Sequence, residues 1–381
     1  MTTQPQHVSQ EQREEGSANA RAHDWDVSHG AWMDRPIDRV TMVVPAVSKL
    51  AANILGGSLL GGGYAIGKAC EVLGMGKTVD NAAFRGGFSA WMWSNGIFPT
   101  VQYEPLRDSG AAFAESIGTA EPSVEDITQT PIIISNHTSY LDGVILANVL
   151  GCPRIVAMAG TREVPVVGRI MEDMDTVFVD RSSSNSRHAT LDAIAGHCSS
   201  WKPGQRPLLI FPEGTTTNGE SLLAFKNGAF STGMPVRPVV LVYTGQWDPA
   251  STTYRETASG AGLAEISDRE WATQFLGHFV HSLHVRVLAP YVPSAAEQAD
   301  PELYARNCHA HVAQSLQRVR AEVQARSWKQ SAGRREGSLG YQFGDLTRTS
   351  IRLARHAVER RLTSHSVQGG SRANRELLLC C

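Results

Sequence analysis

The chain has 381 residues and a formal net charge of −2, from 35 Lys and Arg against 37 Asp and Glu. This near balance argues against a general nucleic-acid binder, which is usually basic overall. Charged residues make up 19% of the chain, below the ~25% of a typical soluble domain, and this favours membrane contact. Six cysteines without CxxC spacing predict neither a zinc site nor a disulfide framework, so no metal is expected.

Residues 1–38 are polar and lack apolar periodicity, so we expect them to be disordered and not to be a signal peptide. Residues 39–104 are predicted to be a membrane-associated helical segment. It contains Leu50–Gly67, 18 residues without a charge but with six glycines, and a second uncharged stretch with two tryptophans, Gly86–Gln102. A spanning helix needs ~20 apolar residues, and tryptophan favours the membrane interface. The pair predicts a membrane-associated hairpin or re-entrant helix. A buried glycine-rich helix pair in a soluble protein is the alternative.

From about Pro131 the pattern becomes that of an α/β domain, which we place at residues 105–325. Apolar runs alternate with helical windows, which is typical of a mostly parallel central sheet flanked by helices, with functional residues at strand ends. The predicted strands are Pro131–Ser135, Arg154–Ala159, Thr176–Asp180, Pro207–Phe211, Val236–Tyr243 and His284–Tyr291. The predicted helices include Leu141–Leu150, Ser186–Trp201 and Pro301–Val323.

Residues 326–381 are predicted to be a basic tail, with 11 basic against 4 acidic residues. Within it, Asp345–Leu362 has the spacing of an imperfect amphipathic helix ringed by arginines, which suits an anionic membrane surface. An ordinary solvated helix is the alternative. The final Cys380 and Cys381 resemble the ending of prenylated small GTPases, and palmitoylation is a second route to lipidation.

The first chemical signal directly follows the strand predicted at Pro131–Ser135 and reads NHTSYLD, residues 136–142. A histidine and an aspartate five residues apart at a strand end can meet. The carboxylate then fixes one imidazole nitrogen, and the other nitrogen accepts a proton near pH 7. A helix N-cap with an incidental histidine is the alternative.

The second chemical signal, FPEGTTTNG at residues 211–219, follows the strand predicted at Pro207–Phe211. It places a carboxylate, glycines and small polar residues at one strand exit, where glycine allows close backbone approach to a ligand. An ordinary Gly/Asn loop is the alternative.

Together the two strings resemble the glycerolipid acyltransferases that share the HxxxxD motif. The segments TVFVDR (176–181), PVRPVVL (235–241) and EVPVVG (163–168) resemble further blocks of that family. FPEGTTTNG with FKNGAF (225–230) narrows the resemblance to the lysophosphatidylcholine and lysophosphatidylethanolamine acyltransferases, over roughly residues 85–320. Two features depart from the pattern: Asn227 stands where many relatives carry Thr or Ser, and no calcium-binding EF-hand loop occurs, so calcium regulation is not expected.

The resemblance implies acyl-CoA-dependent acylation of the free hydroxyl of lysophosphatidylcholine or lysophosphatidylethanolamine. It makes His137 the general base and Asp142 its orienting partner, with an acyl-enzyme on Ser139 as the competing route. Arg181 would bind the acceptor phosphate, since a guanidinium grips phosphate bidentately. An ion pair of Arg181 with Asp180 or with the acidic run 172–175 is the alternative.

Other residues are implied to line the substrate site: Glu213, Gly214, Thr215, Asn136 and Lys226. Capping of its own loop is the alternative role for Glu213. No cofactor is expected, with acyl-CoA as a co-substrate. The expected partners are acyl-CoA, a lysophospholipid and membrane lipids, but no nucleic acid. The expected location is a membrane, that of the endoplasmic reticulum, with the site facing the cytosol or the interface.

Two other functions remain open at this stage. One changes the acceptor to lysophosphatidate or glycerol-3-phosphate. The other is a catalytically silent membrane scaffold, which the intact His137, Asp142, Glu213 and Arg181 disfavour. A nucleotide-binding enzyme is disfavoured because neither GxxxxGK[ST] nor GxGxxG occurs. Headgroup preference, acyl-chain preference and oligomeric state are not predicted.

Overall fold

The computed structural model describes most of the chain between residues 36 and 336, in two units, 1–322 and 323–381. The described residues are 36–106, 126–164, 166–180, 184–219, 221–244, 249–251, 254–256 and 263–336, with Phe113 and Glu115. The predictions of disorder for residues 1–35, of a tail helix at Asp345–Leu362 and of lipidation at Cys380 and Cys381 lie outside them. Residues 36–38, also expected to be disordered, are instead the start of a helix. The central sheet and the candidate site lie in the first unit.

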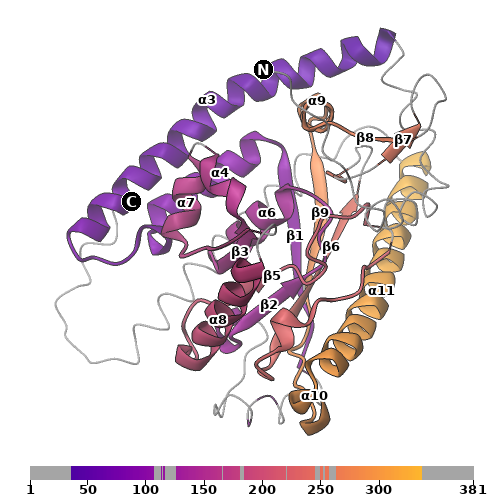
Figure 1. Cartoon of the computed structure of the whole chain (residues 1–381). Helices are drawn as coiled ribbons and strands as arrows, with labels where there is room; N and C mark the ends of the chain where they lie inside the picture. Colours follow the sequence, from indigo (N-terminus) through magenta and orange to yellow (C-terminus); the bar gives the residue numbers. More distant parts are fainter. Residues whose placement is uncertain are drawn as a thin grey trace, which may run out of the picture. The chain divides into compact units, whose positions relative to one another are not determined.

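A seven-stranded mixed sheet forms the centre of this unit, in the order β1-β9-β6-β2-β5-β3-β4 (Figure 1). The five strands from β6 to β4 run parallel, while β9 pairs antiparallel with β6 and β1 pairs parallel with β9. The strands are β1 Ile97–Tyr103, β2 Ile132–Ser135, β3 Arg154–Met158, β4 Val177–Val179, β5 Leu208–Ile210, β6 Val236–Thr244 and β9 His281–Val287. The predicted α/β fold with a mostly parallel sheet is therefore confirmed.

The helices are α3 Pro36–Val72, α4 Ala82–Ser94, α6 Leu141–Val149, α7 Val167–Asp173, α8 Ser184–Ser200, α9 Asp268–Gly277, α10 Ala295–Ala299 and α11 Pro301–Glu336. Four 3₁₀ turns are η1 Thr78–Asp80, η2 Ile127–Gln129, η3 Ala159–Glu163 and η4 Asn227–Phe230, and a small separate hairpin pairs β7 Tyr254–Glu256 with β8 Leu263–Glu265. Each strand and helix predicted between residues 131 and 323 is present with bounds within about four residues, except that α11 continues to Glu336, well beyond the predicted end at Val323 and into the segment expected to be a separate tail. Elements that are short or lack a clear period were not predicted from the sequence, namely β1, β7, β8, α7, α9 and α10.

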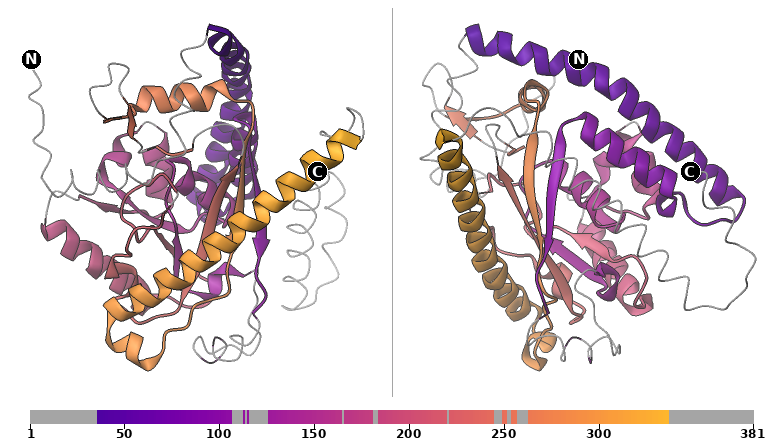
Figure 2. Two further views of the ribbon diagram at one scale, coloured as in Figure 1. Left: turned by 90° about the vertical axis from the view of Figure 1, so that its right-hand side faces the viewer. Right: turned by 180° about the vertical axis from the view of Figure 1, so that it is seen from behind.

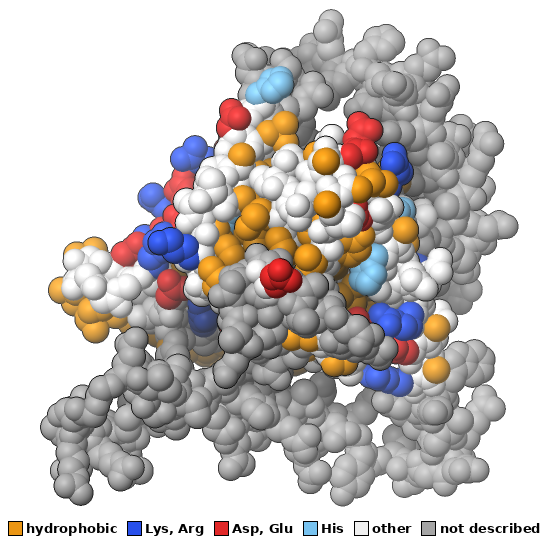
Figure 3. All heavy atoms as spheres, turned by 90° about the horizontal axis from the view of Figure 1, so that it is seen from below, with side chains coloured by type: hydrophobic (Ala, Val, Ile, Leu, Met, Phe, Trp, Pro, Cys, Tyr) orange, Lys and Arg blue, Asp and Glu red, His pale blue; other side chains and the backbone are white. Residues whose placement is uncertain are grey.

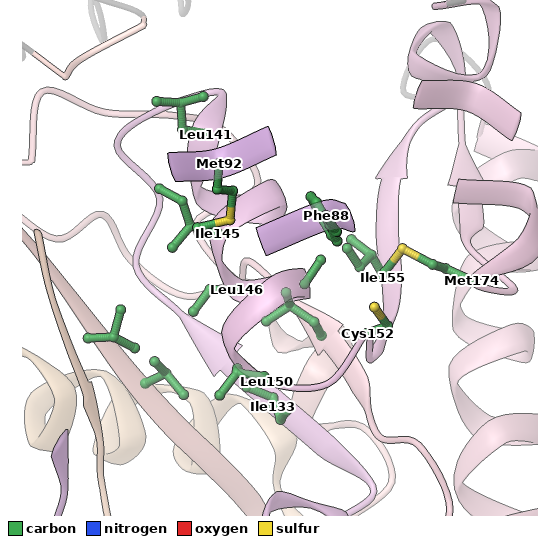
Figure 4. Close-up of a cluster of buried hydrophobic side chains, with 14 of the residues drawn as sticks. Phe88, Met92, Ile133, Leu141, Ile145, Leu146, Leu150, Cys152, Ile155 and Met174 are labelled. Atoms are coloured by element: carbon green, nitrogen blue, oxygen red, sulfur yellow. The ribbon is translucent and has the colours of Figure 1, made fainter. Parts of the chain in front are cut away.

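Alternation along the strands divides the core between the two faces of the sheet, because successive side chains of a strand point to opposite sides. Ile133 of β2 packs in a cluster with Phe88 and Met92 of α4 and with Ile145 and Leu146 of α6 (Figure 4). Outside this cluster, the Phe230 ring packs edge to face against the Tyr304 ring of α11, with the ring centroids 4.9 Å apart. Both sets are buried.

Glycines of both uncharged stretches allow α3 and α4 to pack against each other, and the two helices lie side by side in every view (Figures 1 and 2). A Cβ on Gly63 would lie 2.3 Å from the Ala83 carbonyl oxygen, and one on Gly87 would lie 2.3 Å from that of Leu59. Any side chain at these two positions would force the helices apart. The predicted N-terminal helical hairpin is thus α3 followed by α4.

The second uncharged stretch, Gly86–Gln102, does not form one arm of the helical hairpin as predicted, because only its first part is helical. Helix α4 ends at Ser94, with Asn95 as its C-cap. At the next residue, Gly96, φ is +74° and a Cβ would lie 1.9 Å from the Phe279 carbonyl oxygen. The chain then continues as β1, an edge strand of the central sheet paired with β9. The sheet therefore begins before residue 105, the proposed start of the α/β domain.

The basic and acidic side chains of the described residues lie next to one another on the face drawn in Figure 3, rather than in separate patches. This distribution agrees with the nearly neutral net charge of the chain. The described residues of that face therefore do not form the basic patch that is typical of nucleic-acid binding.

Candidate active site

The segment NHTSYLD joins the end of β2 to the start of α6, so its side chains lie where a ligand binds in α/β folds. Asp142 is in the first turn of α6 and is fully buried. Its Oδ2 accepts hydrogen bonds from the backbone N–H of Thr138 (2.6 Å) and of Ser139 (2.8 Å). The carboxylate therefore folds the turn back on itself and shapes the loop that carries His137.

His137 is brought into contact with Asp142 as the spacing predicts. Its Nδ1 lies 2.9 Å from Asp142 Oδ2. Because an ionised carboxylate can only accept, Nδ1 carries the proton and Nε2 keeps a lone pair. The imidazole stacks on the Phe211 ring at a centroid distance of 4.0 Å and is 20% exposed. Within the described part of the chain Nε2 has no hydrogen-bond partner, so it is placed to accept a proton.

Glu213 of the FPEGTTTNG segment is buried and connects this segment to the NHTSYLD loop by a hydrogen bond. It is 3% exposed; its Oε1 accepts from the His137 backbone N–H at 2.7 Å, and its Oε2 accepts from that of Leu223 at 3.0 Å. Burial raises the pKa of this carboxyl to about 7, although the two N–H groups act in the opposite direction. These contacts match the alternative of loop capping, and a direct contact with the acceptor stays a prediction.

This raised pKa predicts how Glu213 affects stability. The native state binds a proton that the unfolded state has lost between pH 4.5 and about 7, so the contribution of Glu213 to stability falls as pH rises through this window. The shift corresponds to about 3 kcal/mol. The unfolding temperature is measured in detergent as a function of pH. The slope of this curve should differ most between wild type and Glu213→Gln from pH 5 to pH 7. Hydrogen bonds hold the pKa of Glu297 at about 2 despite its burial, so Glu297→Gln should leave that slope as in wild type. An unchanged slope in Glu213→Gln would contradict this assignment.

The remaining loop residues predicted as substrate contacts lie beside this framework. Gly214 has φ +72°, and its missing side chain leaves room for Lys226, whose Nζ lies 2.6 Å from where a Cβ would be. Lys226 is exposed, and Thr215 is partly exposed. Thr217 was not predicted as a site residue. Its backbone N–H and its hydroxyl both donate to the His137 carbonyl oxygen, at 2.9 and 3.2 Å.

Asn136 has a different position from the one expected for a substrate contact. It is buried; its Nδ2 donates to the Leu241 carbonyl at 3.1 Å, and its Oδ1 accepts from the Leu241 N–H at 2.8 Å. The side-chain amide thus extends the pairing of β2 with β6 by one residue. We therefore assign Asn136 to holding the loop on β6.

Four further observations concern the site. Ser139 is fully buried, which disfavours it as a nucleophile. Tyr243, which the sequence analysis did not single out, donates from its hydroxyl to Asp142 Oδ1 at 2.5 Å. Arg181 lies outside the described residues, two positions beyond the end of β4. Among the described residues no cluster of three or more His, Cys, Asp or Glu could hold a metal ion, and the expectation of a metal-free site stays a prediction.

A family model and several curated relatives match the part of the chain that carries this site. Residues 121–242, which include the complete loop from Asn136 to Asp142 and the FPEGT segment, match the family model named Acyltransferase. The chain contains an acyltransferase domain. Lysophosphatidylcholine acyltransferase 1 of Danio rerio is 36% identical over 191 residues, covering 50% of this chain and 34% of that protein. The human protein of that name is 36% identical over 186 residues, covering 49% of this chain and 32% of that protein.

Other relatives of the acyltransferase domain carry a broader name. Human lysophospholipid acyltransferase LPCAT4 is 33% identical over 192 residues, covering 49% of this chain and 34% of that protein. The matched part of the chain thus spans about a third of the length of these relatives. Among solved structures, the 1-acyl-sn-glycerophosphate (LPA) acyltransferase PlsC of Thermotoga maritima is similar over 74% of this chain and 98% of that one, with 14% identity and a TM-score of 0.43. A likeness of this size decides neither fold nor function.

Proposed function

We propose that this protein transfers a fatty acyl group from acyl-CoA to the free glycerol hydroxyl of a lysophospholipid, with lysophosphatidylcholine or lysophosphatidylethanolamine as acceptor. The observation that carries the proposal is the His137–Asp142 pair at the carboxyl end of β2, with Nδ1 held at 2.9 Å and Nε2 left for a substrate. The acceptor class rests on the names of the relatives that match this domain.

The geometry supports a direct transfer. Nε2 of His137 removes the proton from the acceptor hydroxyl as its oxygen attacks the thioester carbonyl. The new C–O bond forms, the C–S bond breaks, and the imidazolium returns its proton to the sulfur of CoA. Asp142 holds the tautomer and stabilises the charge on the ring. A nucleophilic Ser is not needed because a thioester is already activated.

Arg181 is proposed to hold the phosphate of the acceptor. β4 and β2 run parallel within one sheet, so their carboxyl ends lie at the same edge. Glu172 is already engaged by Arg162 at 2.7 Å, and Asp175 is engaged by Lys77 at 2.6 Å. This weakens the alternative in which Arg181 pairs with the acidic run 172–175.

We expect Arg181→Ala to raise the KM for the lysophospholipid by about 10- to 100-fold, because a charge-assisted hydrogen bond to the acceptor is lost. The KM for acyl-CoA should change much less. Arg181→Lys should recover only part of the loss, since ammonium lacks the planar fork. Steady-state kinetics with each substrate varied in turn measures both values. Equal changes in the two KM values would refute the role.

A membrane location is supported by α3. Its segment Val43–Val72 is long and apolar enough to cross a membrane. The only charged residue from Val43 to Gly67 is Lys49, which is 3% exposed and donates to the Phe275 carbonyl oxygen at 2.7 Å. The outward surface is therefore free of charge and strongly apolar, with Val43, Val44, Val47, Leu50, Ile54, Leu55, Leu59 and Ile66 between 48% and 75% exposed. We propose that this surface meets lipid. The endoplasmic reticulum and the facing of the site stay predictions.

The acceptor is tested with purified protein, one labelled acyl-CoA and a panel of lysophospholipids with choline, ethanolamine or no headgroup, together with glycerol-3-phosphate. We expect the diacyl choline or ethanolamine product to form fastest. Preferred acylation of lysophosphatidate or glycerol-3-phosphate would overturn the acceptor class. Absence of transfer to every acceptor would favour a silent scaffold.

A further inference from the structure

The carboxyl group of Asp142 is buried and is surrounded by hydrogen-bond donors. The residue is 0% exposed, and its only ion-pair partner in the described part of the chain is His137. A buried charge must be compensated by hydrogen bonds. Oδ2 receives three donors: the His137 Nδ1 and the backbone N–H groups of Thr138 and Ser139. Oδ1 receives the hydroxyl of Tyr243.

The sheet brings Tyr243 to this position from a distant part of the sequence. The pairing of β6 with β2 ends at Ser135 and Val239, while β6 continues to Thr244 beside β9. The Asn136 amide fixes this extension at Leu241. Leu241 is buried in the core, and Tyr243, two residues further along, lies on the same side of the strand. The phenol is thus held over the catalytic loop by strand geometry.

The hydroxyl of Tyr243 is fixed as a donor to the carboxylate. Burial and the neighbouring Asp142 raise the pKa of Tyr243 well above its usual value, so the phenol stays protonated. Its oxygen also takes part in a hydrogen bond with the Ser139 side chain. Ser139, Tyr243, Asp142 and His137 therefore form one hydrogen-bonded chain that ends at the imidazole.

We propose that Tyr243 is a positioning residue of the acyl transfer, acting through Asp142 on His137. Resting on the proposed function, this role has two parts. The hydroxyl fixes the carboxylate plane so that Oδ2 faces Nδ1. The hydroxyl also offsets part of the negative charge of the Asp142 carboxylate through its hydrogen bond. Asp142 therefore stabilises the imidazolium form of His137 less strongly than it would without this donor.

The test is Tyr243→Phe, which removes only the hydroxyl. We expect kcat to fall by about 10- to 100-fold, as for one lost hydrogen bond to a charged group, with little change in KM for either substrate. Because the carboxylate loses a donor, it holds a proton on His137 more tightly. The acidic limb of the pH–rate profile should therefore move to higher pH.

A matched control is available elsewhere in the same unit. Tyr291 donates its hydroxyl to the carboxylate of Glu297 at 2.6 Å, and its backbone bridges to Val236 at the opposite end of β6. Tyr291→Phe removes the same kind of bond and should leave both kcat and the pH profile unchanged. Equal losses in Tyr243→Phe and Tyr291→Phe would mean that the effect comes from destabilisation and would refute the positioning role.

A double-mutant cycle separates this inference from the proposed function. On an Asp142→Asn background, Tyr243→Phe should cost much less than in wild type, because the charged acceptor is gone. If wild type is active and His137→Ala is inactive, but Tyr243→Phe matches wild type in rate and pH profile, the inference fails while the function stands. If wild type transfers no acyl group, an NMR titration of the His137 ring, assigned with His137→Gln, still tests the inference. An identical titration in wild type and Tyr243→Phe would refute it.

Discussion

Replacing His137 by Ala should reduce acyl transfer by about 10²- to 10⁴-fold, the usual size of general-base catalysis. The reason is local: Nδ1 is held by Asp142 at 2.9 Å, which leaves Nε2 as the proton acceptor at the site. Asp142→Asn should also cause a severe loss. An amide nitrogen at the Oδ2 position would face three N–H donors and would no longer fix the tautomer.

Ser139→Ala is the control for this prediction, because it tests the competing acyl-enzyme route. Ser139 is fully buried within the loop, so its loss should leave most of the activity. Rates are measured as labelled phospholipid formed from acyl-CoA, with unfolding temperatures showing that each variant is folded. An inactive Ser139→Ala together with a trapped acyl-protein would replace the general-base mechanism with a covalent one.

Two acidic substitutions on the outer surface of α3 should release the protein from membranes. Leu50 and Ile54 are 62% and 75% exposed, so Leu50→Asp and Ile54→Asp together disturb no packing inside the protein. Each carboxylate costs about 2.5–3.5 kcal/mol at bilayer depth, or on the order of 100-fold in partition. We expect most of the double variant in the soluble fraction after flotation with phospholipid vesicles.

A matched control is Leu191→Asp on α8, an exposed leucine away from α3 (Figure 1). It should float with the vesicles as wild type does. A truncation at residue 104 would be a poorer test, since it removes β1 from the sheet. If the double variant still floats with the vesicles at low salt, α3 is not the anchor. The chain beyond residue 326 would then be the segment to test.

The parts of the site that sequence alone predicted are those built from near neighbours in the chain. His137 and Asp142 are five residues apart at a strand end, and local geometry brings them together. The parallel order of β2 and β5 follows from alternation of strands and helices, which places Glu213 at the same edge. Periodicity and spacing were sufficient for both.

The parts that sequence did not predict depend on register between distant segments. Tyr243 reaches Asp142 because β6 extends beyond β2, and Thr217 reaches the His137 carbonyl because its loop folds back. Neither register can be read from composition. The division of Gly86–Gln102 was missed for a related reason. Absence of charge is common to a membrane helix and to a partly buried edge strand, and Asn95 and Gly96 mark the change from one to the other.

The central claim is direct acyl transfer to a lysophospholipid, and one measurement addresses it most closely. Purified protein is mixed with acyl-labelled acyl-CoA and lysophosphatidylcholine or lysophosphatidylethanolamine, and free CoA thiol, labelled phospholipid and protein-bound label are followed together. We predict equal amounts of thiol and phospholipid, neither formed without lysophospholipid, and no label on the protein. Thiol release with free fatty acid as the product, label retained on the protein, or no reaction with any lysophospholipid would contradict the account.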